Sequence, residues 1–318
     1  MRLETVLYCV AVIGYLIGDD ILDWWLWFLL LNGNSGELWL YLLLGGVTVF
    51  TGIIAAMLGV GGGFLNVPII NYLANETINV AIGTSLFVIM FTSFSATLGY
   101  GVKRVIDFKL GLALVTTSIP GAFLGAFLTG LVREGILQLI FGIVLTIIGI
   151  NMILKKQNQN PFVYQETLKE ERKSIKSVLI WKRKIKMGNG ETYEYSINLP
   201  LGLAFSFLAG LSSGLLGIGG GIVQVPVMNI ILGVPMVVTV ATSMFMIIFT
   251  SAFATFEHAM LGQVDWPVGI VMIIGAIIGA QIGCRITLKL NPQLLRKIFG
   301  SAMILIAIKM IYEALISL

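Results

Sequence analysis

The sequence predicts an all-α integral membrane protein, made of two pseudo-symmetric repeats with four elements each and glycine-broken helices, plus one N-terminal span. Three observations predict this class. First, 57% of the 318 residues are hydrophobic and only 11% are charged, whereas a soluble domain carries about 25% charged residues. Second, apolar runs of about 20 residues, the length that crosses a bilayer, recur from one end of the chain to the other. Third, the two halves of the chain repeat each other.

The repetition is strongest in two glycine-rich stretches, "GVGGGFLNVPIIN" from Gly59 and "GIGGGIVQVPVMN" from Gly217. They are identical at 7 of 13 positions, at an offset of 158 residues. The stretches "GTSLFVIMFTSFSAT" and "ATSMFMIIFTSAFAT" follow them and match at 9 of 15 positions at the same offset. The register then holds without a gap, so that Asp107 falls on Asp265. Internal symmetry of this kind is typical of transporters, whose substrate sites form where the repeats meet.

This pattern divides the chain into four regions. They are an N-terminal span with an interfacial Trp-rich segment (1–37), a first membrane repeat (38–154), a basic loop (155–197) and a second membrane repeat (198–318). The apolar parts of the repeats are expected at 38–74, 78–100, 110–130 and 135–154, and at 198–232, 235–257, 267–288 and 293–316.

The N-terminal region begins with an apolar run from Thr5 to Gly18 that resembles the core of a signal peptide. One basic residue precedes it, Asp19-Asp20 follow it, and no small-residue cleavage site is present, so we expect a retained first span. The next segment, "ILDWWLWFLL", holds three tryptophans, which prefer the membrane interface. We place this segment at the outer surface, with the N-terminus inside.

The region between the repeats is polar, and its lysines and arginines outnumber its acids. Such a loop is expected in the cytoplasm, because basic residues accumulate on that side of a membrane. Within it, "VLIWKRKIKMGNGETYEYSIN" predicts a β-hairpin with Asn189-Gly190 at the tight turn. The loop is too short to hold a catalytic soluble domain.

Loop charges indicate the relative orientation of the repeats. The loop between the second and third parts carries Lys103, Arg104 and Lys109 in the first repeat, but Glu257 and Asp265 in the second. The following loop has the reverse bias, being the more basic one in the second repeat. Equivalent loops therefore face opposite sides, which favours inverted-topology repeats with the glycine-broken segment as a re-entrant hairpin. The alternative is one long broken span per repeat, which makes the repeats parallel and the charge asymmetry accidental.

The glycines break a helix inside the membrane, where irregular backbone survives only if it is buried in protein or lines a wet cavity. Pro68 and Pro226 each remove a further backbone donor. We expect a half-helix to start near Gly63 and another near Gly221. Two such N-termini, meeting near the midplane, would form an anion site without a charged side chain. The alternative is close helix packing, which is the better account of the GxxxG spacing at Gly275, Gly279 and Gly283 but the weaker one for three consecutive glycines. A phosphate-binding nucleotide loop is excluded, because no Lys-Ser/Thr follows the glycines.

The expected substrate-binding residues are the glycines at the two breaks and the polar residues near them. They are Gly61, Gly62, Gly63, Asn66, Thr84, Ser85, Gly219, Gly220, Gly221, Gln224, Thr242 and Ser243. The amides of Asn66 and Gln224 could donate hydrogen bonds to a ligand, and the hydroxyls lie at the start of the second helix of each repeat, near the broken segment. The competing role for each hydroxyl is a bond to its own i−4 carbonyl. Asn71 and Asn229 are alternatively expected to cap the half-helices.

His258 is the single histidine, and it follows Glu257 at the end of a helix. This pair could titrate in a proton-coupled cycle, although a histidine near a surface is usually not functional and the other repeat has no counterpart. No catalytic residue, metal ligand or cofactor is expected, because the apolar spans hold no Cys–His or paired-carboxylate cluster. We expect no enzyme and no nucleic-acid partner. Cys9 and Cys284 form neither a disulfide framework nor a metal site.

The paired glycine stretches, each followed by a T-S-x-F…F-T-S helix, resemble the sulfite exporter family TauE/SafE, also called the TSUP permeases, over about residues 40–316. The resemblance implies a multi-pass permease of the prokaryotic inner membrane for small sulfur-containing anions such as sulfite or organosulfonates, bound between the repeats. A receptor or scaffold working through the basic loop is the less favoured class. The alternatives within the transporter class are a passive anion channel and a carrier of another small carboxylate. The expected partners are the lipid bilayer and a small anionic substrate, and a homodimer is compatible with the sequence.

Overall fold

The computed structural model describes residues 35–128, 134–154, 180–188, 192–216 and 219–317. The chain forms two units, Met1–Leu43 and Leu44–Leu318, and the second holds all elements after the start of the first described helix. The predicted N-terminal span, the Trp-rich segment and the Asn189-Gly190 turn lie outside the described residues.

The described part of the chain is almost wholly helical, and the helices follow the apolar parts of the sequence to within a few residues. The first half contains α3 (Ser35–Leu58), α4 (Gly63–Leu73), α5 (Ile78–Val102), α6 (Phe108–Leu128) and α7 (Glu134–Leu154). The second half contains α9 (Leu199–Leu216), α10 (Gly221–Pro226), the π-helix η2 (Val227–Ile231), α11 (Met236–Met260), α12 (Trp266–Lys289) and α13 (Pro292–Ser317).

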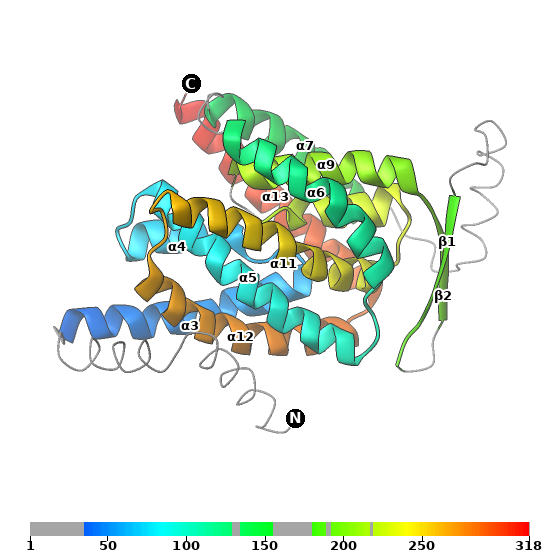
Figure 1. Cartoon of the computed structure of the whole chain (residues 1–318), viewed down its shortest axis with the longest axis horizontal. Helices are drawn as coiled ribbons and strands as arrows, with labels where there is room; N and C mark the ends of the chain where they lie inside the picture. The colour runs from blue at the N-terminus through cyan, green and yellow to red at the C-terminus, as the bar shows by residue number, and fades with distance from the viewer. Residues whose placement is uncertain (1–34, 129–133, 155–179, 189–191, 217–218, 318) are drawn as a thin grey trace. The chain divides into compact units, whose positions relative to one another are not determined.

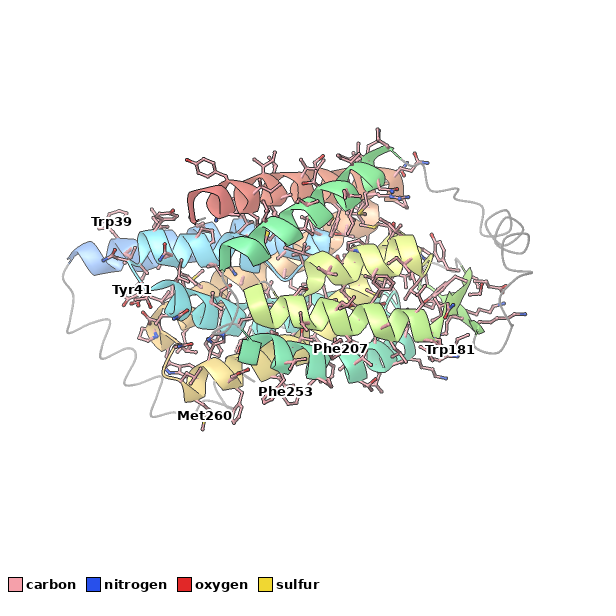
Figure 2. The ribbon with its side chains drawn as sticks, turned by 90° about the horizontal axis from the view of Figure 1, so that it is seen from above. Trp39, Tyr41, Trp181, Phe207, Phe253 and Met260 are labelled. Atoms are coloured by element: carbon pink, nitrogen blue, oxygen red, sulfur yellow. The ribbon has the colours of Figure 1, made fainter. Side chains whose placement is uncertain are left out.

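Five of the described helices, α3, α5, α6, α11 and α12, are long and apolar enough to cross a membrane. Large apolar side chains also cover the outside of the helices, as Phe253 and Met260 show on α11, where they are 56% and 75% exposed (Figure 2). An outer surface of this kind suits lipid and not water. The predicted class, an all-α integral membrane protein, is therefore confirmed.

Small residues let helices of the two halves approach closely. A Cβ atom added at Gly275, Gly279 or Gly283 of α12 would collide with backbone oxygens of α3. The equivalent contact joins α6 to α9, because a Cβ atom at Gly121 would collide with the carbonyl oxygen of Phe207. The packing role predicted for the three glycines of α12 is confirmed. In each case the first helix of one half, α3 or α9, packs against α12 or α6 of the other half.

The directions of the helices follow from contacts along them. Thr84 and Ser95 of α5 lie beside Asp265 and Ile277 respectively, so α5 and α12 run in the same direction. α12 follows α11 after a short turn and runs in the opposite direction (Figure 1). Consequently α5 and α11, which occupy equivalent places in the two halves, run in opposite directions (Figure 1).

A two-stranded antiparallel sheet of β1 (Ile180–Lys186) and β2 (Thr192–Asn198) lies where the sequence predicts a hairpin, with Ile180 opposite Asn198. One face carries Ile185, Tyr195 and Ile197, which are buried in the same apolar cluster as helix residues. The other face exposes lysines. The sheet stands at the end of the helices where α5 leads into α6 (Figure 1).

Candidate functional site

Both glycine stretches break their helices by adopting left-handed backbone conformations. Gly59, Gly61 and Gly62 have φ values between +70° and +94°, and Gly219 and Gly220 have φ values of +76° and +75°. Residues with a side chain rarely adopt these values, so glycine is required here for its backbone and not only for its size. These glycines recur in both halves because the backbone makes the same left-handed turn at each break.

After each break the chain folds back along the helix it has just left. The Thr51 hydroxyl of α3 donates a 2.8 Å hydrogen bond to Oδ1 of Asn66 in α4. In a straight helix these residues would be about 22 Å apart, at 1.5 Å per residue. In the second half, the Ser206 hydroxyl of α9 lies 3.4 Å from Oε1 of Gln224 in α10, the residue equivalent to Asn66. Each broken segment is therefore a helical hairpin.

The two breaks meet each other. A Cβ atom added at Gly221 would lie 2.6 Å from the carbonyl oxygen of Gly59 and 2.6 Å from Cα of Val60. Ile89 and Ile247, which are equivalent residues of α5 and α11, both contact Gly61. We call Gly59–Gly63, Gly219–Gly221 and these two isoleucines the glycine junction.

Two helix N-termini lie at the glycine junction. Gly62 precedes α4 and Gly220 precedes α10, and in neither case does a side chain cap the first turn. The N–H groups at the start of a helix have no partner within the helix, and they lie at the positive end of its dipole. Negative charge is therefore favoured at this place, although none of the residues that form the glycine junction is basic.

A small pocket adjoins the junction on the side of the second half. It is lined by Ser118, Ala209, Gly210, Gly219, Gly220, Gln224, Met246, Ile247 and Thr250. None of these residues is charged, and the pocket has room for about one water molecule. A ligand larger than water therefore does not fit this pocket in this conformation, and its binding here requires the surrounding helices to move apart.

Ser243 supports the broken backbone directly, because its hydroxyl donates a 2.7 Å hydrogen bond to the carbonyl oxygen of Gly59. Ser85 is the equivalent residue of the first half. Its hydroxyl is fully buried and has no hydrogen-bond partner within the described ranges. Ser243 thus lies at the junction, whereas Ser85 lies one helical turn before the junction residue Ile89 on α5.

Thr84 and Thr242 connect the two halves at the ends of helices. Oγ1 of Thr84 accepts a 2.8 Å hydrogen bond from the backbone N–H of Asp265, and Oγ1 of Thr242 accepts a 3.0 Å bond from the backbone N–H of Asp107. Each aspartate in turn accepts a bond from the first turn of its own helix, α12 or α6. These contacts place Thr84 beside the start of α12 and Thr242 beside the start of α6, and they give both residues a structural role that the sequence did not reveal.

The amide side chains differ between the halves. Asn66 is buried and held by Thr51, whereas Gln224 lines the pocket and its Nε2 lies 3.5 Å from the sulfur of Met246. Asn71 and Asn229 do not cap the N-termini of the half-helices. They donate hydrogen bonds to the carbonyl oxygens of Glu76 and Val234, and so fix the loops that follow the half-helices.

Glu257 and His258 lie near the end of α11, about 15 Å along the helix from Ile247 at 1.5 Å per residue. Nδ1 of His258 is 2.8 Å from Oε1 of Gln263. At the same end, burial and the nearby carboxylate of Asp265 raise the pKa of Glu76. The pair predicted for proton coupling is therefore not brought together with the glycine junction.

A second polar cluster, which sequence reasoning missed, ties the hairpin sheet to the helices. Asp107 precedes α6 and is buried. Its carboxylate accepts two hydrogen bonds from the guanidinium of Arg183 in β1 and a 2.6 Å bond from the hydroxyl of Tyr195 in β2. Burial alone would raise the pKa of Asp107, but the bonds from Arg183, Tyr195 and the Leu110 N–H together lower it. The repeated Asp107 and Asp265 were a usable signal for helix capping, but not for the contact with the sheet.

Comparisons with known proteins agree with the architecture. The family model described as "Sulfite exporter TauE/SafE" matches residues 42–310. The "Probable membrane transporter protein YunE" of Bacillus subtilis is 32% identical over 276 residues, which cover 85% of this chain and 96% of that protein. "Sulfite exporter TauE/SafE family protein 6" of Arabidopsis thaliana is 24% identical over 296 residues, which cover 70% of this chain and 68% of that protein. No solved structure gives a significant match.

Proposed function

Because this chain belongs to the sulfite exporter TauE/SafE family, a family of membrane transporters, we propose that it is a secondary transporter of small sulfur-containing anions. Sulfite and organosulfonates are the substrates that the family name and the chemistry of the site favour. The chain is a multi-pass membrane protein, and the plasma membrane of a prokaryote is its proposed location, with the hairpin sheet in the cytoplasm.

The observation that carries the proposal is the meeting of two helix N-termini inside the helical bundle. Gly62 and Gly220 lead into α4 and α10 without a side-chain cap, and a Cβ atom on Gly221 would reach the backbone of Gly59. Backbone N–H groups and helix dipoles bind anions at such places. A site without fixed positive charge suits a carrier, because the ion must also be released.

The proposed site consists of Gly61–Gly63 and Gly219–Gly221, with the amides of Asn66 and Gln224 and the hydroxyls of Ser85 and Ser243 around it. Thr84 and Thr242 retain a hydroxyl proton that could serve a ligand, but their contacts with Asp265 and Asp107 favour a structural role. Glu257 and His258 would act in proton coupling only at one end of the substrate path, because they lie at the end of α11.

The repeats are proposed to have inverted topology. The opposite directions of α5 and α11 support it (Figure 1). The basic Lys103 and Arg104 also support it, because they lie at the end of the bundle where the sheet is attached. Two halves of this kind can rock against each other and expose a central site to either side in turn.

The test is counterflow in proteoliposomes. Vesicles are preloaded with unlabelled sulfite, sulfoacetate, thiosulfate, taurine or lactate, and entry of labelled sulfite is followed. We expect saturable exchange with the sulfur anions alone. Exchange with lactate instead would overturn the substrate assignment and keep the carrier. A flux that does not saturate and shows no exchange would indicate a passive channel.

A further inference from the structure

Two rows of hydroxyl side chains start at the glycine junction. On α5, Ser93 and Thr97 follow Ile89 at intervals of four residues, and on α11, Ser251 and Thr255 follow Ile247 in the same way. Residues four apart lie on one face of a helix. Both isoleucines contact Gly61, so each row continues from the junction along its helix.

Three of the four hydroxyls in these rows lack the usual hydrogen-bond partner. Serine and threonine in apolar helices normally donate to the carbonyl oxygen four residues earlier, as Ser251 does to Ile247 at 2.6 Å. Ser93, Thr97 and Thr255 have no hydrogen-bond partner in the described part of the chain. Ser93 is 0% exposed and Thr255 is 7% exposed, and buried polar groups are rarely left without a partner.

Building on the function proposed above, we infer that the two rows line the two halves of the substrate path. The α5 row (Ser93 and Thr97) leads from the junction toward the sheet, and the α11 row (Ser251 and Thr255) leads toward the opposite end. This follows because α5 and α11 run in opposite directions (Figure 1). Thr97 and Thr255 each lie about 12 Å beyond their isoleucine, at 1.5 Å per residue.

The hydroxyls suit the movement of an anion that sheds part of its water. Each offers one hydrogen-bond donor and no charge, so the ion is held weakly at every step. The pocket at the junction already extends along α11 from Met246 to Thr250, beside the start of the α11 row. When one half rocks open, the row on that side replaces water around the ion, while the other row stays closed.

Cysteine accessibility tests the inference. Ser93, Thr97, Ser251 and Thr255 are each replaced by cysteine, and membrane vesicles of either orientation are treated with the membrane-impermeant 2-sulfonatoethyl methanethiosulfonate. Labelled positions are identified by mass spectrometry, so the native Cys9 and Cys284 remain in place. The exposed Lys182 of β1, also replaced by cysteine, marks the side of the sheet.

Neighbouring residues provide matched controls. Phe94 is 48% exposed and Phe253 is 56% exposed on the outer, apolar surface of α5 and α11. Cysteine at these places should face lipid and stay unlabelled. Each variant must elute from gel filtration in detergent as a single species, at the same volume as the unmodified protein, before its labelling is read.

We expect Ser93→Cys and Thr97→Cys to react only from the side of Lys182→Cys, and Ser251→Cys and Thr255→Cys only from the other side. Rates should exceed those of Phe94→Cys and Phe253→Cys by about tenfold or more, as for residues in an anion-attracting path. Absence of reaction at all four positions, reaction of both rows from one side, or reaction of every position from both sides would overturn the inference. The readout does not depend on which anion is carried, so a failure of sulfite exchange would leave it intact.

Discussion

At Gly221 the space for a side chain is absent, because the backbone of the other half occupies it. A Cβ atom would lie 2.6 Å from the carbonyl oxygen of Gly59 and 2.7 Å from Cδ1 of Ile247. Close approach of two backbones in a membrane protein needs residues of this size. The contact between the two breaks therefore depends on the absence of a Cβ atom at Gly221, and not on the general apolar character of the segment.

Replacing Gly221 by alanine should separate the two breaks. Overpacking of this kind costs about 1–3 kcal/mol, so we expect a lower melting temperature in detergent and a loss of most uptake. Gly46→Ala is the matched control, because a Cβ atom at Gly46 of α3 has no neighbour within 4 Å. Equal melting temperatures for the two variants would contradict the contact between the breaks.

Thr84 and Thr242 allow a test between a structural role and a role in substrate binding. Replacing either by valine keeps the shape and removes the acceptor for the backbone N–H of Asp265 or Asp107. We expect a loss of stability of about 1–3 kcal/mol, the cost of an unsatisfied buried donor, with the KM for the substrate nearly unchanged. The melting temperature and the concentration dependence of uptake check this. A raised KM with unchanged stability would show that the hydroxyls bind substrate instead.

At the scale of elements, a buried carboxylate supplies the charged contacts that attach the hairpin sheet to the helices. The carboxylate of Asp107 accepts hydrogen bonds from Arg183 of β1 and Tyr195 of β2. Its backbone N–H donates a hydrogen bond to Oγ1 of Thr242 in α11. The N–H of Gly188 adds a 3.0 Å bond to the carbonyl oxygen of Lys103. The sheet is thereby connected to both halves of the protein at the end toward which the α5 row leads.

Arg183→Gln should release the sheet. It removes charged hydrogen bonds to a buried acceptor, which are worth about 1.5–3 kcal/mol, so amide hydrogen exchange in β1 and β2 should accelerate. The control is Lys184→Gln, because the 2.6 Å ion pair of Lys184 with Glu194 is exposed and such pairs contribute little. Equal exchange in both variants would contradict the role of Asp107 as the attachment point.

The same carboxylate sets the pH dependence of this attachment. The pKa of Asp107 is lowered in the folded protein, so its contribution is complete above the usual carboxyl pKa of about 3.9. It is lost only as the pH falls through the lowered value. Exchange in the sheet should therefore be insensitive to this group between about pH 5 and 7, once corrected for intrinsic rates.

At the scale of the whole molecule, much of the architecture could be predicted from the sequence. Apolar length located the helices, and the repeated glycines located both breaks and their meeting. These features depend on local or periodic sequence patterns, so they can be recognised directly in the sequence. The hydrogen bond between Thr84 and Asp265 joins residues 181 positions apart. The periodicity of the sequence does not predict such a contact.

The predicted binding residues divide in the same way. The glycines and Ser243 lie at the junction because their backbone conformation and position within the motif place them there. Thr84 and Thr242 share that motif, but their hydroxyls contact the backbone N–H groups of Asp265 and Asp107 at the starts of α12 and α6. The attachment of Arg183 to Asp107 also escaped prediction, because a basic loop residue is usually a signal of orientation alone.

Inverted topology predicts that equivalent loops face opposite sides of the membrane. Lys103 and Leu261 occupy equivalent positions and are both exposed. As cysteines they should be labelled by an impermeant thiol reagent from opposite sides of oriented vesicles, with Lys103→Cys on the side of the sheet. Labelling of both positions from the same side would favour parallel repeats and contradict this arrangement.

The central claim is that an anion is carried through the glycine junction, and counterflow of labelled sulfite by three variants in proteoliposomes tests it most directly. A leucine at Gly62 or Gly220 must adopt a left-handed conformation and fill the junction, whereas Gly46→Leu places its side chain where no neighbour lies. The account predicts saturable exchange by the unmodified protein and by Gly46→Leu, and none by folded Gly62→Leu or Gly220→Leu. Normal exchange by both junction variants would contradict it.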